Sequence, residues 1–304
     1  MIGAVVVGYY PDYPVLDALL LGLLDQADLV IYVNNGGGEN YLSHHPTQKA
    51  RVQLVDSGRN NGVGSALNQG LELALKQGCS YVATFDQDSI LPDGLIKGLL
   101  EAHLELQGNG IVCAAVGPVF YDRRAEQIIY YPFYKEQNSS IHTIRSETIS
   151  DRLIEVDVLI TSGMLVNVKS WAAGFHYDPA LFVDHTDTEW CHRVRAEGFR
   201  LYACLDLKMG HALSDTVPVR VLGRHFFRYS PLRRYYYFRN TVYLLLRPYI
   251  SWAWKRQLAY GLGLRFFVNV MIDRSKLSSL KMMCKGVVDA FSGRLGEINN
   301  KPRH

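Results

Sequence analysis

Apolar runs of strand length alternate with helical patterns through the first hundred residues, and no other feature of the sequence constrains the fold as much. The runs expected to form strands are residues 2–9, 29–33, 51–55 and 80–85. A leucine-rich helix follows the first run, a second helix ends near Gln77 before Gly78, and a third is expected to begin at Pro92. Strands and helices that alternate at this spacing form a parallel sheet with crossover helices. The sequence therefore predicts an α/β fold with a Rossmann-like, mostly parallel central sheet flanked by helices.

The pattern changes after residue 110. Further strands are expected at residues 111–121, 128–133, 153–160 and 199–205, the last of these being the final strand of the chain. A polar stretch at 135–140 is expected to separate strands, and short helices are expected at 168–173 and 190–197. Beyond Ser230 the pattern predicts helices only.

The composition is that of a globular protein of one or two domains, with 48% hydrophobic and 20% charged residues in 304. Five cysteines without Cys-x-x-Cys or zinc spacing argue against a disulfide framework or structural zinc, and they suit a reducing compartment. The first residues lack the pattern of a signal peptide. No apolar run approaches the roughly 20 residues that span a bilayer. These features predict a cytoplasmic protein.

Charge divides the chain unevenly, although the formal net charge is only +3. Residues 220–304 hold 17 Lys and Arg against three acids, whereas the remainder is acidic. The sequence predicts a catalytic domain at 1–219 and a basic, aromatic-rich helical region at 220–304 that faces an anionic partner. Arginines interleaved with aromatic residues, as at 224–239, favour a helix in a membrane interface; the aromatics could instead be core, but arginines are harder to bury.

Two carboxylates, Asp86 and Asp88, stand where the fourth apolar run ends. Side chains two apart in a strand share a face, so both can point the same way. Their repulsion would be relieved by a divalent cation that carries a diphosphate. The carboxyl ends of parallel strands are also where α/β proteins bind ligands. The pair predicts a metal–diphosphate site, with a solvated turn as the alternative.

Glycine and carboxylate clusters follow other strands. The glycines at 36–38 and at 62 and 64 could receive a nucleotide on backbone amides or form tight turns, and neither G-x-G-x-x-G nor a P-loop is present. Asp184, Asp187 and Glu189 precede a helical stretch, where one could act as a general base or all could complement the helix dipole. His211 is a structural histidine or a metal ligand beside Asp88.

Taken in order, the motifs are Tyr9-Tyr10-Pro11-Asp12, Val33-Asn34-Asn35-Gly36, Asn60-Asn61-Gly62-Val63-Gly64, Asn68-Gln69-Gly70, Asp86-Gln87-Asp88-Ser89, Thr161-Ser162-Gly163, Phe182 to Trp190, Gly210-His211, Arg234 to Asn240 and Lys285 to Gly296. This series resembles the inverting family 2 glycosyltransferases with a GT-A fold, and among them the bacterial rhamnosyltransferases of O-antigen and related polysaccharide synthesis. The resemblance covers nearly the whole chain, and several motifs in order are far more specific than any one. It implies a GT-A fold with a C-terminal helical extension.

The resemblance also implies roles for individual residues. Asp86 would contact the nucleoside, while Asp88 and His211 would hold Mg²⁺ or Mn²⁺ on the donor diphosphate. Asp187 falls at the position of the catalytic base, with Asp184 and Glu189 as its competitors. The other positions implied to bind the nucleotide sugar are Tyr9, Asn34, Asn35, Asn61, Gly62, Asn68, Gln87, Ser162 and Gly163. The family usually has Asp where this chain has Asn34, and many relatives have an acid at Thr186.

The activity implied is transfer of L-rhamnose, with inversion, from TDP-β-L-rhamnose to a saccharide hydroxyl. The acceptor would be linked to a lipid diphosphate, and the enzyme would be associated with the inner face of the bacterial cell membrane through residues 220–304. One alternative is the same fold with another sugar nucleotide, such as a UDP- or TDP-hexose or a galactofuranose donor. Another is a non-catalytic module that binds anionic ligands or nucleic acid. The acidic body and the lack of a nucleic-acid-binding motif argue against a nucleic-acid partner.

Overall fold

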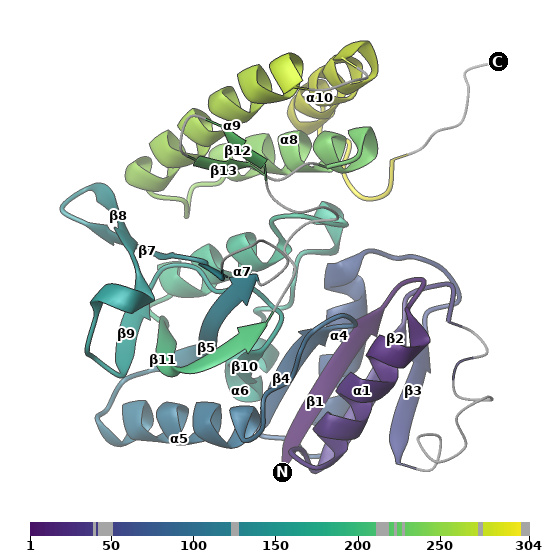
Figure 1. The fold of residues 1–304 in the computed structure, drawn as a ribbon, viewed down its shortest axis with the longest axis vertical. Helices are drawn as coiled ribbons and strands as arrows, with labels where there is room; N and C mark the ends of the chain where they lie inside the picture. The colour runs from purple at the N-terminus through teal and green to yellow at the C-terminus, as the bar shows by residue number, and fades with distance from the viewer. Residues whose placement is uncertain are drawn as a thin grey trace.

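The structure is a computed structural model, and it describes residues 1–38, 41, 51–122, 128–210, 219–221, 224–226, 229–272 and 276–298. A central sheet with helices on both faces carries a separate layer of C-terminal helices (Figure 1). This layer lies above the edge of the sheet at which the parallel strands end. The carboxyl ends of those strands therefore face the C-terminal helices.

The central sheet has nine strands in the order β3-β2-β1-β4-β10-β5-β11-β9, with β6 paired to β5. Their bounds are β1 Ile2–Gly8, β2 Leu29–Asn34, β3 Val52–Asp56, β4 Tyr81–Asp86, β5 Cys113–Asp122, β6 Ile129–Tyr130, β9 Leu153–Val156, β10 Met164–Asn167 and β11 Arg200–Gly210. Strands β1 to β4 are parallel, and β11 is parallel to β5. The expectation of a mostly parallel sheet is confirmed.

Two helical layers bury the faces of this sheet. The helices α1 (Tyr13–Leu24) and α5 (Leu95–Gly108) pack their leucines on one face, against side chains such as Val6 and Phe85. The helices α4 (Val63–Lys76), α6 (Val168–Ala172) and α7 (Thr186–Ala196) cover the other face. Side chains alternate between the faces of a strand, so the continuous apolar runs of β1 and β4 are buried on both sides.

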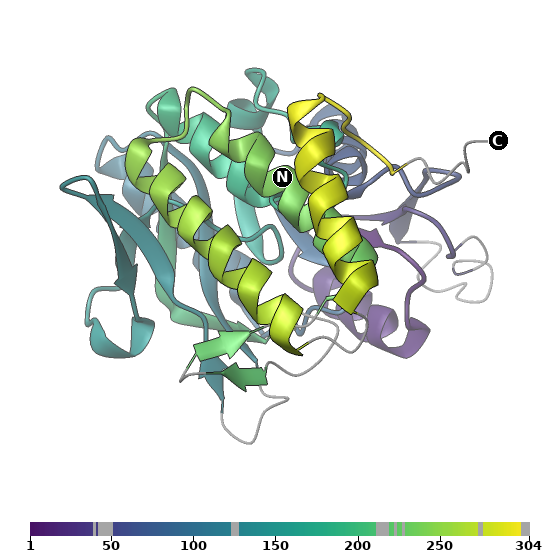
Figure 2. The ribbon, with the colours of Figure 1, turned by 90° about the horizontal axis from the view of Figure 1, so that it is seen from above.

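The C-terminal layer consists of α8 (Pro231–Leu245), α9 (Trp252–Ile272) and α10 (Lys276–Phe291). Viewed from above, α9 and α10 lie over α8 (Figure 2). The Ser230 hydroxyl accepts a hydrogen bond from the Arg233 N–H at 3.2 Å, and Pro231 occupies the first turn, where its missing N–H costs nothing. The expectation of helices beyond Ser230 is confirmed for the described residues.

Several local expectations were wrong. Pro92 does not open α5; the helix begins after Gly94, whose φ of +71° suits glycine. The polar stretch at 135–140 is a hairpin between β7 (Phe133–Gln137) and β8 (Ser140–Ile144), and Asn138 and Ser139 both have positive φ. Asn and Ser are common in tight turns. The polar residues therefore belong to the turn and to the ends of the two paired strands.

Strand and helix limits differ at the site as well. The expected strand at 153–160 stops at Val156, and the short antiparallel strand β10 follows the 161–163 turn unpredicted. The helix α7 begins at Thr186 rather than at 190, which places Asp187 and Glu189 inside its first turn. The strand β11 is not the last, because β12 (Val219–Val221) pairs with β13 (Arg224–Phe226).

Two of the three arginines of α8, Arg234 and Arg239, are buried, contrary to the interpretation of this segment as a membrane-interface helix. Arg239 is 0% exposed and Arg234 is 5% exposed, and Tyr235, Tyr236 and Phe238 are buried with them. Burial is possible because Arg239 donates to three main-chain carbonyl oxygens, and a guanidinium is less costly to bury when its donors are satisfied. This segment therefore packs inward, onto the catalytic part.

All five cysteines are free, and all but Cys284 are buried. Among the described residues, no helix combines the length and the apolar character that crossing a bilayer requires.

Candidate active site

The ends of β1 and β4 are joined by a reciprocal pair of hydrogen bonds. The Tyr9 N–H donates to Gln87 Oε1 at 2.6 Å, and Gln87 Nε2 donates to the Tyr9 carbonyl at 3.1 Å. The Tyr9 ring remains 48% exposed and packs edge-to-face with the Tyr10 ring at 4.8 Å. Gln87 thus positions the backbone of Tyr9 and leaves an exposed aromatic surface at the carboxyl edge of the sheet.

Asn34 and Asn35 follow β2 and shape the neighbouring turns. Asn34 is fully buried; its Oδ1 accepts from the N–H groups of Gly36 and Gly38, both at 3.1 Å, and its Nδ2 donates to Asp56 at 3.2 Å. Asn35 Oδ1 accepts from the Asn61 N–H at 2.9 Å, which ties the end of β2 to the turn before α4. Both side chains therefore support the backbone at this edge of the sheet.

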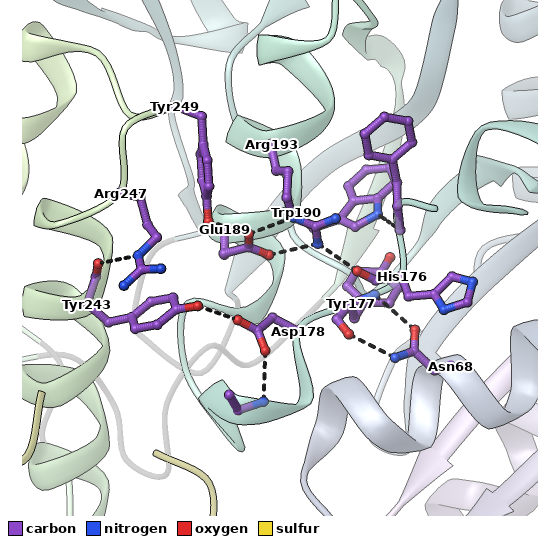
Figure 3. A network of polar contacts seen from close by, with 12 residues as sticks. Asn68, His176, Tyr177, Asp178, Glu189, Trp190, Arg193, Tyr243, Arg247 and Tyr249 are labelled. Atoms are coloured by element: carbon purple, nitrogen blue, oxygen red, sulfur yellow. Dashed lines mark hydrogen bonds and ion pairs between the residues drawn. The ribbon is translucent and has the colours of Figure 1, made fainter. Parts of the chain in front are cut away.

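The turn before α4 contacts the turn before α7. Gly62 has a φ of +84°, and a Cβ there would lie 2.6 Å from the Phe182 carbonyl oxygen. The Val63 N–H donates to that oxygen at 2.8 Å. Only glycine allows this close approach. Further along α4, the Asn68 side chain bridges the N–H and carbonyl of Tyr177 at 2.9 and 2.8 Å (Figure 3). Asn61 and Asn68 therefore act within the scaffold around the site.

The two carboxylates after β4 lie in different local structure. Asp86 is the last residue of the strand and is partly buried, while Asp88 is exposed in a turn that the Ser89 N–H closes on the Asp86 carbonyl at 3.1 Å. The rule that residues two apart in a strand share a face therefore does not apply to this pair. Ser162 bonds the Ser89 hydroxyl at 2.5 Å, and the Gly163 N–H donates to Thr84 at 2.6 Å. The 161–163 turn thus supports the Asp86–Asp88 turn from the side.

Asp187 lies in the first turn of α7, in a negatively charged setting. Burial raises its pKa to about 6, and the nearby charges of Asp86 and Asp184 contribute to the increase. Hydrogen bonds from the Thr188 N–H at 2.7 Å and the Thr188 hydroxyl oppose it. The ends of β4 and α7, far apart in sequence, therefore bring their carboxylates within electrostatic reach at one site.

The turn that leads into α7 has a strained backbone. Phe182 has φ +66° and ψ −61°, and the Val183 N–H donates to the Leu181 carbonyl at 2.8 Å, which together make a γ-turn of the rare, strained kind. Asp184 and His185 also have positive φ, at +61° and +63°. Non-glycine residues in such conformations cost about 1–3 kcal/mol each and persist only when their surroundings impose them.

Arg239 and Asn240 of α8 impose this conformation, and we call them the Arg239–Asn240 clamp. Asn240 Nδ2 lies within 2.9 Å of the carbonyl oxygens of Leu181, Val183 and Asp184. Arg239 donates to the Leu181 carbonyl at 2.8 Å and to the Gly296 carbonyl at 2.6 Å. Sequence reasoning placed Arg239 in a membrane-interface helix and gave Asn240 no individual role; an Arg-Asn pair within an aromatic helix was the available signal, because such groups are buried only with partners.

Asp184 and His185 are held by the same helix. The Asp184 carboxylate contacts Arg233 Nε at 3.3 Å, and its side chain is 11% exposed. His185 Nε2 lies 2.9 Å from the Thr241 hydroxyl. Burial, together with the positive charge of Arg265, lowers the pKa of His185 to about 3, so the ring is neutral at physiological pH. Asp184 thus has a cationic partner, unlike the more negative surroundings of Asp187.

Glu189 belongs to a buried network on the far side of α7. Its carboxylate is bound by Arg193 Nε at 2.7 Å and Nη2 at 3.0 Å, and by the Tyr249 hydroxyl at 2.6 Å (Figure 3). The side chain is 1% exposed. In the same network the Tyr243 hydroxyl donates to Asp178 at 2.7 Å. Glu189 thus helps to join α7 to the C-terminal helices.

The residues present fit a divalent cation that is shared with a diphosphate. Among the described residues, no group of three acidic, histidine or cysteine side chains is arranged to hold a metal by itself. Mg²⁺ in nucleotide sites typically uses one or two carboxylates and completes its coordination with phosphate oxygens and water. Burial is the main cause of the raised pKa of Asp187, and the negative charges of Asp86 and Asp184, which a cation would offset, add to it. His211, the second expected ligand, lies outside the described residues.

The family model for glycosyl transferase family 2 matches residues 4–160, which include β1 to β5 and the Asp86–Asp88 turn. The match covers half of the chain. The chain belongs to glycosyl transferase family 2. It is therefore a glycosyltransferase, as the motifs indicated.

A full-length relative agrees with this assignment. The dTDP-rhamnosyl transferase RfbF of Shigella flexneri is 29% identical over 294 residues, which are 96% of each chain. The expected similarity to bacterial rhamnosyltransferases is thus confirmed.

Solved glycosyltransferase structures share the fold. S. aureus TarS superposes with a TM-score of 0.59 at 14% identity, covering 96% of this chain and 48% of that one, so the chain spans about half of TarS. TarS 1–349 in complex with UDP-GlcNAc gives the same TM-score over 80% of its length. GalNAc-T7 with UDP, GalNAc and Mn²⁺ has a TM-score of 0.56 at 11% identity, over 88% of this chain and 56% of that one. At these identities the likeness shows the fold alone, and it confirms the GT-A fold.

Proposed function

We propose that this glycosyltransferase transfers L-rhamnose from TDP-β-L-rhamnose to a hydroxyl of a saccharide acceptor, with inversion and with a divalent metal. The observation that supports the mechanism is the cluster of carboxylates at the sheet edge. There burial raises the pKa of Asp187 to about 6, and the charges of Asp86 and Asp184 contribute. A general base works best when its pKa lies near the working pH. The similarity to the rhamnosyl transferase RfbF supports the choice of donor.

In the proposed reaction, Asp187 accepts the proton of the acceptor hydroxyl as that oxygen forms a bond to the anomeric carbon. The bond from this carbon to the diphosphate oxygen breaks on the opposite face, and its electron pair leaves with TDP. One displacement inverts the configuration and gives an α-L-rhamnoside. Asp187 is preferred to Glu189, whose oxygens are occupied by Arg193 and Tyr249, and to Asp184, which contacts Arg233.

The other site residues bind and position the donor. Asp86 would contact the nucleoside, the exposed Tyr9 ring would pack against it, and the turns shaped by Asn35 and Gly62 would lie beside it. Asp88, with His211, would hold Mg²⁺ or Mn²⁺. When bound, the metal would offset charge that grows on the departing diphosphate. No cage of protein ligands is required, because the diphosphate supplies oxygens.

We propose further that the acceptor is linked to a lipid diphosphate and that the enzyme works at the inner face of the cell membrane. The supporting observation is the excess of basic residues in 220–304. An anionic lipid surface attracts such a segment.

Thermal unfolding with a panel of sugar nucleotides, with and without Mg²⁺ or Mn²⁺, tests the donor. A ligand that binds only the folded state raises Tm. We expect TDP-rhamnose with metal to raise Tm more than UDP-glucose, TDP-glucose or UDP-galactofuranose. Asp88→Ala should lose the metal-dependent part of the shift, whereas Asp93→Ala, beyond the turn, should keep it. A larger Tm shift with another donor would contradict the choice of rhamnose. If Asp88→Ala showed the same metal-dependent Tm shift as wild type, Asp88 would not be a metal ligand.

A further inference from the structure

Exposed apolar side chains gather on the two outer helices. Of the 20 large hydrophobic residues that are exposed in the described part of the chain, seven lie on α9 and α10: Trp252, Tyr260, Phe267, Met271, Leu277, Val288 and Phe291. Scattered exposed apolar residues need no explanation, but a contiguous apolar patch marks an interaction surface.

Helical spacing places these residues in two stripes. On α10, Leu277, Cys284, Val288 and Phe291 follow one another at intervals of seven, four and three, so they share one face. The opposite face, with Met283 and Gly286, is buried against α8. On α9, Tyr260, Phe267 and Met271 recur at seven and four. Each outer helix therefore presents an apolar stripe that is largely exposed.

An apolar groove of about 530 Å³ lies between the two helices. Its floor is formed by Phe238 and Leu245 of α8, and its walls by Leu262 and Phe266 of α9 and Val287 of α10. Cys284 and Val288 line it as well, so the exposed stripe of α10 continues into the groove. A groove of this size and composition suits a hydrocarbon chain, because it offers apolar contact area and few polar partners.

The charge around the groove is basic. In the described parts of α9 and α10 there are six Lys and Arg and a single acid, Asp289, although one of the six, Arg265, packs on the rings of Tyr229 and Tyr237. That acid is already bound by Lys285 at 2.5 Å and by Arg294 at 2.8 Å. Lys276 and Lys281 are exposed on α10 next to the apolar stripe. The surface thus combines apolar side chains with unbalanced positive charge, which complements an anionic lipid surface.

We propose that the outer face of α9 and α10 docks on an anionic lipid bilayer and that the groove holds one hydrocarbon chain of a lipid. This proposal rests on the proposed function, and it gives a location for the lipid-linked acceptor. It also corrects the position of the membrane surface, because Arg234 and Arg239 of α8 are buried, whereas α9 and α10 form the outer layer (Figures 1 and 2) and carry seven of the exposed apolar residues. The helix α8 then lies between the bound chain and the active-site turn.

Sedimentation with vesicles tests the docking surface. We expect the full-length protein to bind vesicles of phosphatidylcholine with 30% phosphatidylglycerol and to bind pure phosphatidylcholine at least tenfold more weakly. Phe267→Gln/Val288→Gln should weaken binding to the anionic vesicles at least tenfold, and Lys276→Glu/Lys281→Glu should do the same. Leu104→Gln, an exposed leucine of α5, is the matched control and should bind like wild type. The Tm of each variant should match that of wild type.

Cys284 provides a second readout because it is the exposed cysteine, and the other four are buried. A polarity-sensitive fluorophore attached there should shift to the blue on addition of anionic vesicles. Unchanged emission would overturn the proposal. So would vesicle binding that neither Phe267→Gln/Val288→Gln nor Lys276→Glu/Lys281→Glu weakens. A dimer in light scattering that Phe267→Gln/Val288→Gln dissociates would show that a second copy covers this face instead. Transfer from TDP-rhamnose to a saccharide acceptor, measured without vesicles, separates the two claims. Vesicle binding without such transfer contradicts the proposed function alone.

Discussion

At the scale of single residues, the site depends on carboxylates that have different partners. Asp184 contacts Arg233, and Glu189 is held by Arg193 and Tyr249, so both have charge-assisted contacts. Among the described residues, the donors to Asp187 are the Thr188 N–H and hydroxyl, and the carboxylate is near the charges of Asp86 and Asp184. This difference supports the proposal that Asp187 accepts the proton.

The raised pKa of Asp187 gives a pH dependence with a definite sign. The base acts in its ionised form, so activity should fall as pH decreases through about 6 and protonates it. We expect kcat/KM to drop about tenfold per pH unit below that point. An aspartate at its ordinary value near 3.8 would give the drop two units lower. A profile that stays flat down to pH 4.5 would exclude Asp187 as the base.

Asn34 stands where the family usually has an aspartate, and its contacts explain the exchange. Its Nδ2 donates to Asp56, so Asn34→Asp would remove this donor and place a buried carboxylate beside the exposed carboxylate of Asp56. We expect a loss of about 1–3 kcal/mol of unfolding free energy, measured in urea. The double variant Asn34→Asp/Asp56→Asn restores a donor and an acceptor and should recover much of the loss. An unchanged midpoint in the single variant would refute this explanation.

At the scale of elements, the strained turn at 181–185 connects α8 to α7. The turn sets where α7 begins and therefore where Asp187 lies, and the Arg239–Asn240 clamp holds its carbonyl groups. A displacement of about 1 Å at a catalytic group can cost about 10²-fold in rate. The clamp is therefore expected to affect the chemical step although it is not in the base's own helix.

Asn240→Ala tests this connection. We expect kcat to fall about 10- to 100-fold while the KM for the donor stays near its wild-type value, because the donor is proposed to bind at the β1–β4 edge. The acid limb of the pH profile should also move below pH 6 as Asp187 becomes better solvated. Leu232→Ala, an exposed position on α8, is the control. A drop in Tm with kcat and the pH profile unchanged would show that Asn240 serves only stability.

The element pattern was predictable where the chain is regular and less so where turns decide. Runs such as β1 and β4 are long and apolar, so their periodicity identified them, and the Asp86–Asp88 motif marked the edge. The strand β10 was missed because its four residues are too few for a pattern. The contacts of Asn34 and of the Arg239–Asn240 clamp join segments far apart in sequence, and no local signal encodes such pairings. The roles of individual site residues stay predictions.

At the scale of the whole molecule, the C-terminal helices are joined to the catalytic part by buried polar contacts. The Trp254 indole donates to Asp157 at 2.7 Å, Tyr249 donates to Glu189, and Arg239 reaches the carbonyls of the 181–185 turn. Buried polar groups of this kind cost free energy when a partner is removed. The division at 219/220 stays a prediction about composition, and we expect the two regions to unfold together.

Two tryptophans of α9 test this coupling. Trp254 is 6% exposed and Trp252 is 79% exposed, so they form a matched pair. Trp254→Phe should lower the unfolding free energy by about 1–3 kcal/mol, because it leaves the buried Asp157 without this donor. Trp252→Phe should change it by less than about 0.5 kcal/mol. The wild-type protein should show one transition in urea, followed by tryptophan fluorescence and circular dichroism. Two separate transitions would contradict the coupling.

The most direct test of the proposed chemistry compares donor binding with transfer in Asp187→Asn. The substitution keeps the shape of the side chain and removes its ability to accept a proton. Calorimetry with TDP-rhamnose and Mg²⁺ should give a Kd within about threefold of wild type, whereas transfer to a saccharide acceptor should fall by about 10²–10⁴-fold. Wild-type transfer in Asp187→Asn, with donor binding intact, would contradict the assignment of the base and transfer that role to Asp184 or Glu189.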